Sequence, residues 1–309
     1  MKNHIGLAFS SEQIYYAYFR SDADAFILEK VGTIPYHNKY NEKTFFNSEN
    51  AGRTADLIND YFSSQNITLE DLSFSIESNL TLLKRVTFPA NLDEPGKTEH
   101  INWDLAETLI LPLDQYVYFR SPNKYAFTGF EEELVVAIQK KIIAFFRQIV
   151  QLLDAHLVTL GVHQLAAELL VKNALENQIE NLIILVKIAA NHTESTFLWN
   201  GTYFTSHYDF MSHDTGLSAY IELIKSKISY IESLFEHYKQ PNILVDRILF
   251  YGDNIEDSFL EKIQKNMSIP VDRINTMQNL TVSETLQNTQ IADEGNSQFV
   301  ECIGIALDV

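Results

Sequence analysis

The sequence predicts an α/β protein with two related halves around a cleft and a small inserted subdomain in the first half. Two segments, 5–19 and 185–199, each consist of an apolar run, a polar turn and a second β-prone run, as expected for copies of one strand–turn–strand unit. They lie about one domain length apart in a chain of 309 residues, which is long enough for two domains. We therefore assign 1–176 to the first half, with the insertion at about 80–137, and 177–309 to the second half.

The first half opens with three consecutive strands, followed by a helix and a fourth strand. The helix is expected because Leu57, Ile58 and Tyr61 belong to a set of apolar residues that recurs at helical spacing. After the insertion, an amphipathic helix, a strand and a second helix complete this half, and the polar stretch 173–180 marks the boundary. The expected strands are 5–9, 14–19, 26–34, 72–77 and 158–162, and the expected helices are 51–63, 141–153 and 164–175.

The insertion at 80–137 interrupts this scheme with a small β-rich subdomain. Pro89 stops its first strand, and Trp103 lies on its helix. The loop 121–133 contains Glu131, Glu132 and Glu133, and we expect this acidic run to face solvent. The expected strands are 82–88, 115–120 and 134–139, and the expected helix is 99–109.

The second half repeats the strand–turn–strand opening and continues into the clearest helix of the chain. That helix, 217–238, has a continuous apolar stripe and ends before Pro241. A polar loop, 278–298, then leads to a final apolar segment, 299–307. The expected strands are 182–189, 196–200, 203–210, 247–251 and 269–274, and the second expected helix is 257–267.

Composition excludes several classes of function. The formal net charge is −18, which argues against a nucleic-acid partner because phosphate binding depends on lysine and arginine. The same charge disfavours an anionic membrane surface. The single cysteine, Cys302, excludes an intramolecular disulfide and a thiolate metal cluster, and we expect it to be a buried inert thiol. No apolar run reaches the roughly 18 residues of a membrane span, and no secretion signal is recognisable, so we expect a cytoplasmic protein.

Four segments, taken in order, resemble a known family. Residues 99–107 with 111–115 are similar to an insertion helix and its proline-containing exit, and 134–141 are similar to a strand-to-helix passage. Residues 245–252 resemble the strand before a nucleoside-binding turn, and 302–307 a small-residue C-terminal helix. This order resembles the type IV pilus assembly protein PilM family and its actin-like relatives. The resemblance covers nearly the whole chain and implies an actin-like ATPase fold with two ribonuclease H-like halves.

The resemblance also implies an ATP site that this chain has altered. The family's site uses an acid on each hairpin to order Mg²⁺ and glycines in each turn to admit phosphate oxygens. The first hairpin has Ala8 at the acid position and Ser10 at the glycine position. The second has Lys187 for the acid and Ala189 for the glycine. A Cβ at each turn restricts the backbone and crowds the phosphate path.

The nucleoside-binding turn also lacks a residue type that the family uses to bind the nucleotide. Gly252 is followed by Asp253 where the family has a pair of glycines, and Asp253 would repel nearby phosphates. We therefore expect no cofactor, no metal, no catalytic residue and no ATPase activity. The alternative is an actin-like nucleotide-binding protein, an ATPase or a sugar-kinase-type phosphotransferase, that binds ATP with Mg²⁺ through divergent motifs.

The favoured function is a scaffold or adaptor that binds a protein or peptide partner. In the family, a groove between the first core subdomain and the insertion receives a short cytoplasmic segment of an inner-membrane partner, which would hold this chain at the inner membrane. By resemblance, the groove here would involve 83–88, 103–111 and 116–120. The candidate partner-binding residues are Trp103, Leu111, Tyr116 and Tyr118. Aromatic residues are favoured at protein interfaces, although packing in a subdomain core would explain the same side chains. A third possibility is an orphan actin-like protein that binds a different partner.

Histidines and acids in the second half form a weaker candidate site. His192, His207 and His213 lie near Glu194, Asp209 and Asp214, and such side chains can bind zinc or iron. Their spacings match no ligand pattern, and two of the histidines flank a turn that we expect to be exposed. A solvated turn is therefore the simpler interpretation.

Overall fold

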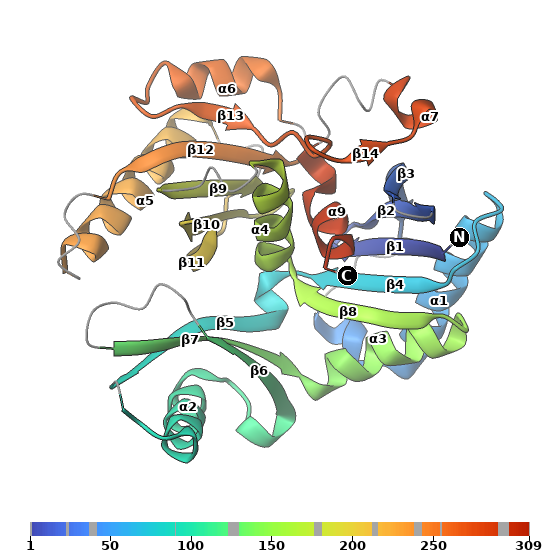
Figure 1. The fold of residues 1–309 in the computed structure, drawn as a ribbon, viewed down its shortest axis with the longest axis horizontal. Helices are drawn as coiled ribbons and strands as arrows, with labels where there is room; N and C mark the ends of the chain where they lie inside the picture. The colour runs from blue at the N-terminus through green and yellow to red at the C-terminus, as the bar shows by residue number, and fades with distance from the viewer. Residues whose placement is uncertain are drawn as a thin grey trace.

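The computed structural model describes residues 2–22, 25–36, 42–89, 91–122, 130–175, 181–211, 216–237, 243–253, 255–289 and 297–308. Three sheets with helices on their faces make an α/β protein, as predicted (Figure 1). Two of the sheets, one in each half, face each other across two helices, and the third forms the insertion at the lower left of Figure 1. Within the described residues, none of the helices combines the length and apolar character required to cross a bilayer.

The first sheet has six strands in the order β14-β3-β2-β1-β4-β8, where β14 is the short strand Thr281–Val282. Strands β1, β2 and β3 form an antiparallel meander, whereas β4 and β8 run parallel to β1. Alternation along β1 sends Ile5, Leu7 and Phe9 towards helices α1 and α3, and Ala8 towards the opposite face. The strands are β1 Lys2–Phe9, β2 Gln13–Asp22, β3 Ala25–Pro35, β4 Asp71–Ile76 and β8 His156–Val162, and the helices are η1 Glu42–Phe46, α1 Ser48–Ser63 and α3 Lys140–Leu152.

The second sheet has five strands in the order β11-β10-β9-β12-β13. Its opening hairpin, β9 with β10, repeats the antiparallel hairpin of β1 with β2, which agrees with the repeated unit in the sequence. Helices α5 and α6 cover one face, while α4 covers the face towards the first sheet. The elements are α4 His163–Ala174, β9 Leu182–Ile188, β10 Thr193–Trp199, β11 Thr202–Asp209, α5 Leu217–His237, β12 Val245–Gly252, α6 Asp257–Gln264 and β13 Val271–Arg273.

The insertion is a three-stranded sheet in the order β5-β7-β6 with helix α2 on one face. Helix α2 begins five residues before the predicted start, because Asp93 caps it by accepting a hydrogen bond from the backbone N–H of Gly96 (2.9 Å) and Pro95 fits its first turn. Strand β7 also starts earlier than predicted. The elements are η2 Ser78–Leu80, β5 Thr81–Pro89, α2 Glu94–Thr108, η3 Leu113–Gln115, β6 Tyr116–Pro122 and β7 Phe130–Gln139.

The acidic run at the start of β7 does not form a solvated face, and that prediction was wrong. Glu132 and Glu133 are buried, and each has an arginine partner. Glu132 pairs with Arg85 of β5, and Glu133 accepts a hydrogen bond from Nε of Arg120 on β6 (2.6 Å). The charges are tolerated inside the subdomain because they are paired across neighbouring strands.

After β13 the chain returns to the first half, although the sequence-based division assigned all of 177–309 to the second. Strand β14 pairs with β3, and α9 packs against β1 and α4. A Cβ at Gly304 would lie 1.8 Å from the carbonyl oxygen of Ala166, so α4 and α9 touch backbone to backbone. Residues 176–180, around the predicted boundary, lie outside the described residues. The remaining elements are β14 Thr281–Val282, α7 Glu284–Gln287, η4 Ser297–Phe299 and α9 Val300–Ala306.

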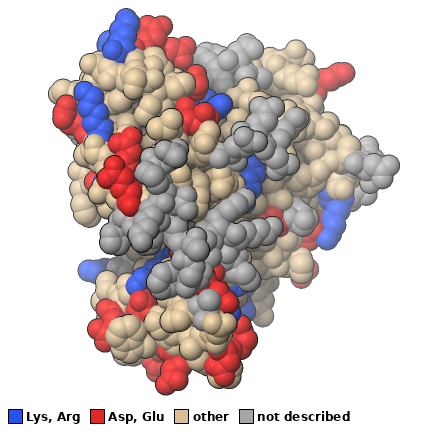
Figure 2. All heavy atoms as spheres, turned by 60° about the vertical axis from the view of Figure 1, so that its left-hand side comes forward, with Lys and Arg blue, Asp and Glu red and all other residues tan. Residues whose placement is uncertain are grey.

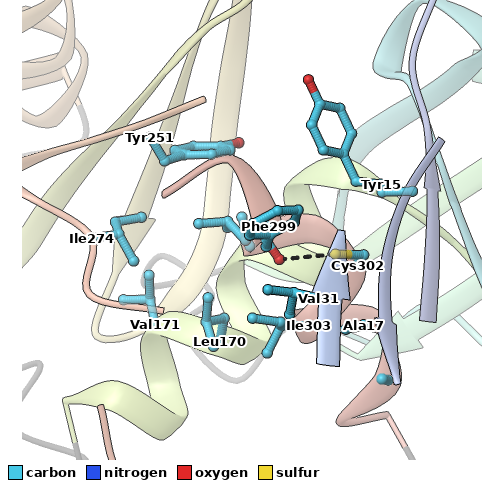
Figure 3. Packing of buried hydrophobic residues seen from close by; sticks show 14 of the residues in the cluster. Tyr15, Ala17, Val31, Leu170, Val171, Tyr251, Ile274, Phe299, Cys302 and Ile303 are labelled. Atoms are coloured by element: carbon cyan, nitrogen blue, oxygen red, sulfur yellow. Dashed lines mark hydrogen bonds between the residues drawn. The ribbon is translucent and has the colours of Figure 1, made fainter. Parts of the chain in front are cut away.

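The core between the two sheets is centred on this returning segment. Figure 3 shows Phe299 and Cys302 between Tyr251 of β12 and Tyr15 of β2. The thiol of Cys302 donates to the carbonyl of Phe299 (3.2 Å), and burial raises its pKa well above the usual range. Cys302 is therefore a buried thiol, as predicted.

Candidate functional site

The two hairpin turns and the end of β12 meet at a small cavity between the halves. Its volume is about 30 Å³. A buried water needs about 10–15 Å³ of such space, so the cavity can hold about two waters. The lining side chains include Ser10, Gln13, Tyr15, Glu77, Lys187, Asp253 and Glu301.

On the first hairpin, the predicted site positions are filled by the hairpin's own packing. Ala8 is fully buried in the core between the sheets and lies opposite Tyr15. The hydroxyl of Ser10 donates to the carbonyl of Gln13 (2.8 Å) and accepts the backbone N–H groups of Glu12 (3.3 Å) and Gln13 (3.2 Å). The side chain of Ser10 therefore closes the turn and engages N–H groups that a phosphate would otherwise approach.

On the second hairpin, Lys187 extends into the interior between the halves. Its Nζ lies 2.6 Å from Oε1 of Glu301, on α9, and 2.9 Å from Nδ1 of His163, at the start of α4. All three residues are buried. An ammonium group has donors only, so His163 must accept through Nδ1 and carry its proton on Nε2. Strand β9 and the two helices between the sheets are thus joined through one cation.

The charges around Lys187 keep it protonated. Burial alone would lower the pKa of Lys187, but the carboxylates of Glu301 and Glu77 raise it overall. Burial and the charge of Lys187 together lower the pKa of His163 well below its usual range, in agreement with a neutral imidazole. Burial likewise raises the pKa of Glu77, at the end of β4. The cluster therefore favours the protonated, cationic form of Lys187.

His192 itself is buried, although its neighbour Asn191 in the hairpin turn is exposed. His192 and Glu194 are buried, since β10 lies between β9 and β11, and His192 stacks on Tyr208. Oε1 of Glu194 accepts a hydrogen bond from Nε2 of Gln164 (2.6 Å). Burial raises the pKa of Glu194 to about 7, against the opposing effect of Lys187. Burial and Lys187 lower the pKa of His192 to about 3.

The turn after β12 closes the cavity from the second half. Gly252 has φ +113°, and a Cβ there would lie 2.1 Å from the carbonyl oxygen of Ile188, so glycine is required. The next residue, Asp253, donates its backbone N–H to Ile188 (3.0 Å) and accepts the Tyr15 hydroxyl on Oδ1 (2.5 Å). Asp253 thus links the second half to β2 of the first.

The remaining predicted site residue, Ala189, lies in the second hairpin turn. Its backbone N–H donates to the carbonyl of His192 (3.0 Å), so this group too is used by the turn itself. Among the described residues, no three histidine, cysteine, aspartate or glutamate side chains are grouped so that they could hold a metal ion. His213 and Asp214 lie outside the described residues.

Comparison with known proteins gives a match in structure only. No family model and no curated protein matches the sequence. The solved PilM–PilN type IV pilus biogenesis complex superposes with a TM-score of 0.75 at 11% identity, covering 98% of this chain and 97% of that chain. The cytoplasmic domain of EpsL, an inner-membrane component of the type II secretion system of Vibrio cholerae, superposes with a TM-score of 0.52 at 9% identity, covering 93% and 96%.

The chain has the actin-like ATPase fold. The two sheets with their repeated hairpins are the two halves of this fold, and the cavity lies between the hairpin turns of the actin-like halves. The predicted fold is confirmed. Since the identities are low, the likeness establishes the fold alone.

In the insertion, the four predicted partner-binding residues fall into two groups, two that pack towards α2 and two that are exposed. Tyr116 and Tyr118 pack towards α2, and the hydroxyl of Tyr118 donates to Asn102 (2.8 Å). Trp103 is 62% exposed and Leu111 is also exposed, on the outside of the subdomain. Their role in binding stays a prediction.

The sequence interpretation missed two of the acids that surround Lys187, Glu77 and Glu301, and named Glu194 only in the histidine site. Glu77 directly follows β4, Glu194 lies on β10 and Glu301 lies on α9. Glu301 gave a signal, because it lies in the apolar segment 299–307, where an unpaired charge would be costly, whereas Glu194 lies in the polar stretch 191–196. Only the fold brings the three together with the lysine of β9.

Proposed function

We propose that this chain is a non-catalytic actin-like scaffold, a pseudo-ATPase that acts by binding a protein partner. The observation that supports this most is the position of Lys187, whose ammonium group is paired with Glu301 (2.6 Å) and His163 (2.9 Å) inside the cleft. Nucleotide hydrolysis in this fold needs a metal and positioned charge around the phosphates. Here a side-chain cation neutralises the carboxylates that could have ordered the metal.

The size of the cleft supports the same proposal. The cavity between the hairpins is about 30 Å³. Small-molecule sites usually have about 300–1,000 Å³. A triphosphate would require Ser10, Lys187 and Asp253 to leave their present partners, so nucleotide entry would cost one buried ion pair and two partly buried hydrogen bonds.

One observation favours the alternative, a nucleotide-binding protein with divergent motifs. Beside Asp253 lies a second hollow of about 270 Å³, lined by Tyr220, Phe259 and Leu217 and by the polar side chains of Glu256 and Lys262. Its size suits a small planar group. Its two carboxylates, Asp253 and Glu256, belong to no group of three metal-binding side chains among the described residues, so the hollow supports binding more than turnover.

For the scaffold, the surface best suited to an extended partner segment is strand β6. It is an edge strand of the insertion sheet, whereas the other edge, β5, approaches the second half through Arg85, whose guanidinium lies 4.0 Å from the ring centroid of Phe204. An edge strand presents unpaired backbone groups, and an extended peptide can add to it. Phe119 on β6 is 57% exposed and would contact such a peptide. A cytoplasmic tail of an inner-membrane assembly protein is the proposed partner, which would place the chain at that membrane.

A peptide array tests this proposal. The array would display the cytoplasmic tails of the inner-membrane proteins encoded in the same genome, probed with the purified chain. We expect a small set of tails to bind, with at least tenfold weaker binding after Phe119→Ser and unchanged binding after Tyr230→Ser, an exposed residue of α5. ATP hydrolysis, measured in parallel, should stay at background. Absence of any bound tail, or full binding by Phe119→Ser, would contradict the proposed partner site.

A further inference from the structure

Helices α4 and α9 are packed onto the first sheet as one body. Figure 1 shows them side by side between the two sheets. A Cβ at Gly6 of β1 would lie 2.0 Å from the carbonyl oxygen of Cys302 on α9, and Gly304 of α9 makes a similar contact with Ala166 of α4. Backbones that touch leave no gap across which the elements could shift, so β1, α9 and α4 move together. The contacts between α4 and the second sheet therefore decide whether the two halves stay closed.

One face of α4 meets the second sheet through polar side chains. Gln164 and Glu168 lie four residues apart, so they are neighbours on the same face of the helix. Nε2 of Gln164 donates to Oε1 of Glu194 on β10 (2.6 Å), and Oε2 of Glu168 accepts the backbone N–H of Tyr203 on β11 (2.9 Å). All four residues are buried. These two hydrogen bonds connect the second sheet to the body formed by β1, α9 and α4.

The side-chain amide of Gln164 has an unused acceptor. Its oxygen, Oε1, is buried and has no hydrogen-bond partner among the described residues. An unpartnered buried acceptor is costly. An ionised carboxylate has acceptors only, so an ionised Glu194 cannot satisfy this oxygen, whereas a protonated carboxyl group has one O–H donor. A proton on Glu194 would therefore complete a two-way pair, in which the amide donates to the carboxyl group and the carboxyl group donates to the amide.

The charges around Glu194 favour that proton. Lys187 is its cross-strand neighbour on β9, but the ammonium group of Lys187 lies against Glu301 (2.6 Å), and no ion pair joins Glu194 to a lysine or arginine in the described part of the chain. Burial raises the pKa of Glu194 to about 7, against the opposing effect of Lys187. Among the groups that face Glu194, only Lys187 is a cation. These groups are Lys187 of β9, Glu301 of α9, Gln164 of α4, Ser78 of η2, Tyr203 and Tyr208 of β11 and Tyr251 of β12, while Glu77 and His163 share Lys187.

Burial distinguishes Glu194 from the acids on the surface. Figure 2 shows aspartate and glutamate side chains spread over the face that it presents, in contact with solvent. Water stabilises an ionised carboxylate at such positions, whereas Glu194 is 2% exposed and lacks that solvation. A buried Glu194 that loses its proton is therefore stabilised if the second sheet moves away from α4 and water reaches the carboxylate.

We propose that Glu194 and Gln164 form a proton-dependent latch between the second sheet and α4. With the proton on Glu194, the two-way pair holds the halves closed. When the proton leaves the carboxyl oxygen for a water molecule, the amide oxygen has no donor and the carboxylate is buried without a cation of its own, so the second sheet separates more readily. The latch depends neither on the proposed partner tail nor on the binding of a nucleotide.

The direction of the pH effect follows from where the proton binds more tightly. The pKa of Glu194 is raised from 4.5 to about 7 in the closed form, so the closed form binds the proton more tightly than an open form in which water reaches Glu194. The latch is therefore at full strength below about pH 4.5 and weakens as the pH rises through about 7.

Hydrogen exchange of the purified full chain tests the latch. The reporter is the backbone N–H of Tyr203, because its acceptor, Glu168, lies one helical turn from Gln164. Rates at pH 5 and pH 8 are corrected for the intrinsic pH dependence of exchange. We expect the protection of this N–H to fall at least about tenfold from pH 5 to pH 8. The exchange should also be nearly insensitive to low urea, because a local opening exposes little surface whereas global unfolding accelerates with urea.

Matched variants assign the effect to Glu194. A glutamine in Glu194→Gln cannot ionise, and its amide can both donate to and accept from Gln164, so the protection of Tyr203 should change by less than about threefold between the two pH values. Glu222→Gln, at an exposed position of α5, should behave like the native chain. Circular dichroism would verify folding, and if Glu194→Gln does not fold, the pH and urea dependence of the native chain still decides. Equal pH dependence in the native chain and Glu194→Gln, or exchange of Tyr203 only through global unfolding, would overturn the proposal.

Discussion

Lys187 Nζ lies 2.6 Å from Glu301 Oε1, and this ion pair connects the opening hairpin of the second half to the helix that returns to the first. Lys187 is on β9, whereas α9, which contains Glu301, packs against β1 and α4. The cation therefore lies between the two halves, where an actin-like ATPase would hold its metal and phosphates by the family resemblance. A stable link between halves in this position suits a scaffold whose shape does not depend on a ligand.

Removing the cation should destabilise the protein strongly. Lys187→Met would leave Glu301 buried without its partner, and breaking a buried pair on one side costs about 3–5 kcal/mol of unfolding free energy. Urea denaturation measures this loss. Lys225→Met, at an exposed position of α5, should change stability by less than about 0.5 kcal/mol. In the double variant Lys187→Met, Glu301→Met we expect less destabilisation than the sum of the two single changes. Strict additivity would show that the two groups are not coupled.

Glu194 should make the stability of the protein depend on pH. Its pKa in the folded protein is raised from 4.5 to about 7, so the folded state binds the proton more tightly than the unfolded state. The resulting stabilisation is fully present below about pH 4.5 and is lost as the pH rises through about 7. Glu194→Gln stays uncharged and retains an oxygen for Gln164. Relative to the native chain, this variant should therefore be more stable at pH 8 than at pH 5, as measured by denaturation at both values. Glu222→Gln, an exposed control, should show no such difference.

The contact between α4 and α9 should exclude any side chain at Gly304. Gly304→Ala places a methyl group 1.8 Å from the carbonyl oxygen of Ala166, and two backbones would have to separate. We expect a loss of at least about 2 kcal/mol, in the range of overpacked cores. Gly52→Ala in α1 meets no atom within 4 Å and should instead stabilise by about 0.5–1 kcal/mol through helix propensity. Thermal unfolding of the two variants should therefore shift in opposite directions. Shifts of the same sign would be inconsistent with the close packing of α9.

The Tyr15–Asp253 hydrogen bond should contribute to the closure of the cleft. Tyr15→Phe removes the donor from a carboxylate across the halves, and a hydrogen bond to a charged group contributes about 1.5–3 kcal/mol. Tyr118→Phe removes a neutral bond to Asn102 within the insertion and should cost about 0.5–1.5 kcal/mol. Hydrogen exchange gives the more specific readout, because only Tyr15→Phe should accelerate exchange at the backbone N–H of Asp253. Equal exchange in both variants would argue against a bond between the halves.

Local patterns in the sequence indicated the elements, but not the pairings between distant segments. The apolar periodicity of α1, α3 and α5 and the two repeated hairpins was visible, because each pattern extends over a few consecutive turns or strands. The polar loop 278–298 gave no sign of β14, whose strand character depends on pairing with Ile27 and Leu28. Glu132 looked solvated because its partner, Arg85, lies 47 residues away. Long-range partners of this kind exist only in the fold.

In the cleft, too, the sequence predicted what depends on neighbouring residues but not what depends on distant ones. Ala8, Ser10, Lys187 and Ala189 stood out because each departs from a residue type that the family motif requires. Glu194 was visible as a residue, but its burial was not, since nothing local shows that β10 is an interior strand of the second sheet. The ion pair of Lys187 with Glu301 joins β9 to α9, two elements that are far apart in the sequence, and no spacing rule predicts it.

Thermal unfolding with magnesium and ATP, magnesium alone and ATP alone tests the central claim most directly. A ligand at a hundred times its Kd would stabilise the folded chain by about 2.7 kcal/mol and raise the midpoint by several degrees. With Lys187 paired to Glu301 inside the cleft, we expect the same midpoint under all three conditions. A rise that requires magnesium and ATP together would contradict the account.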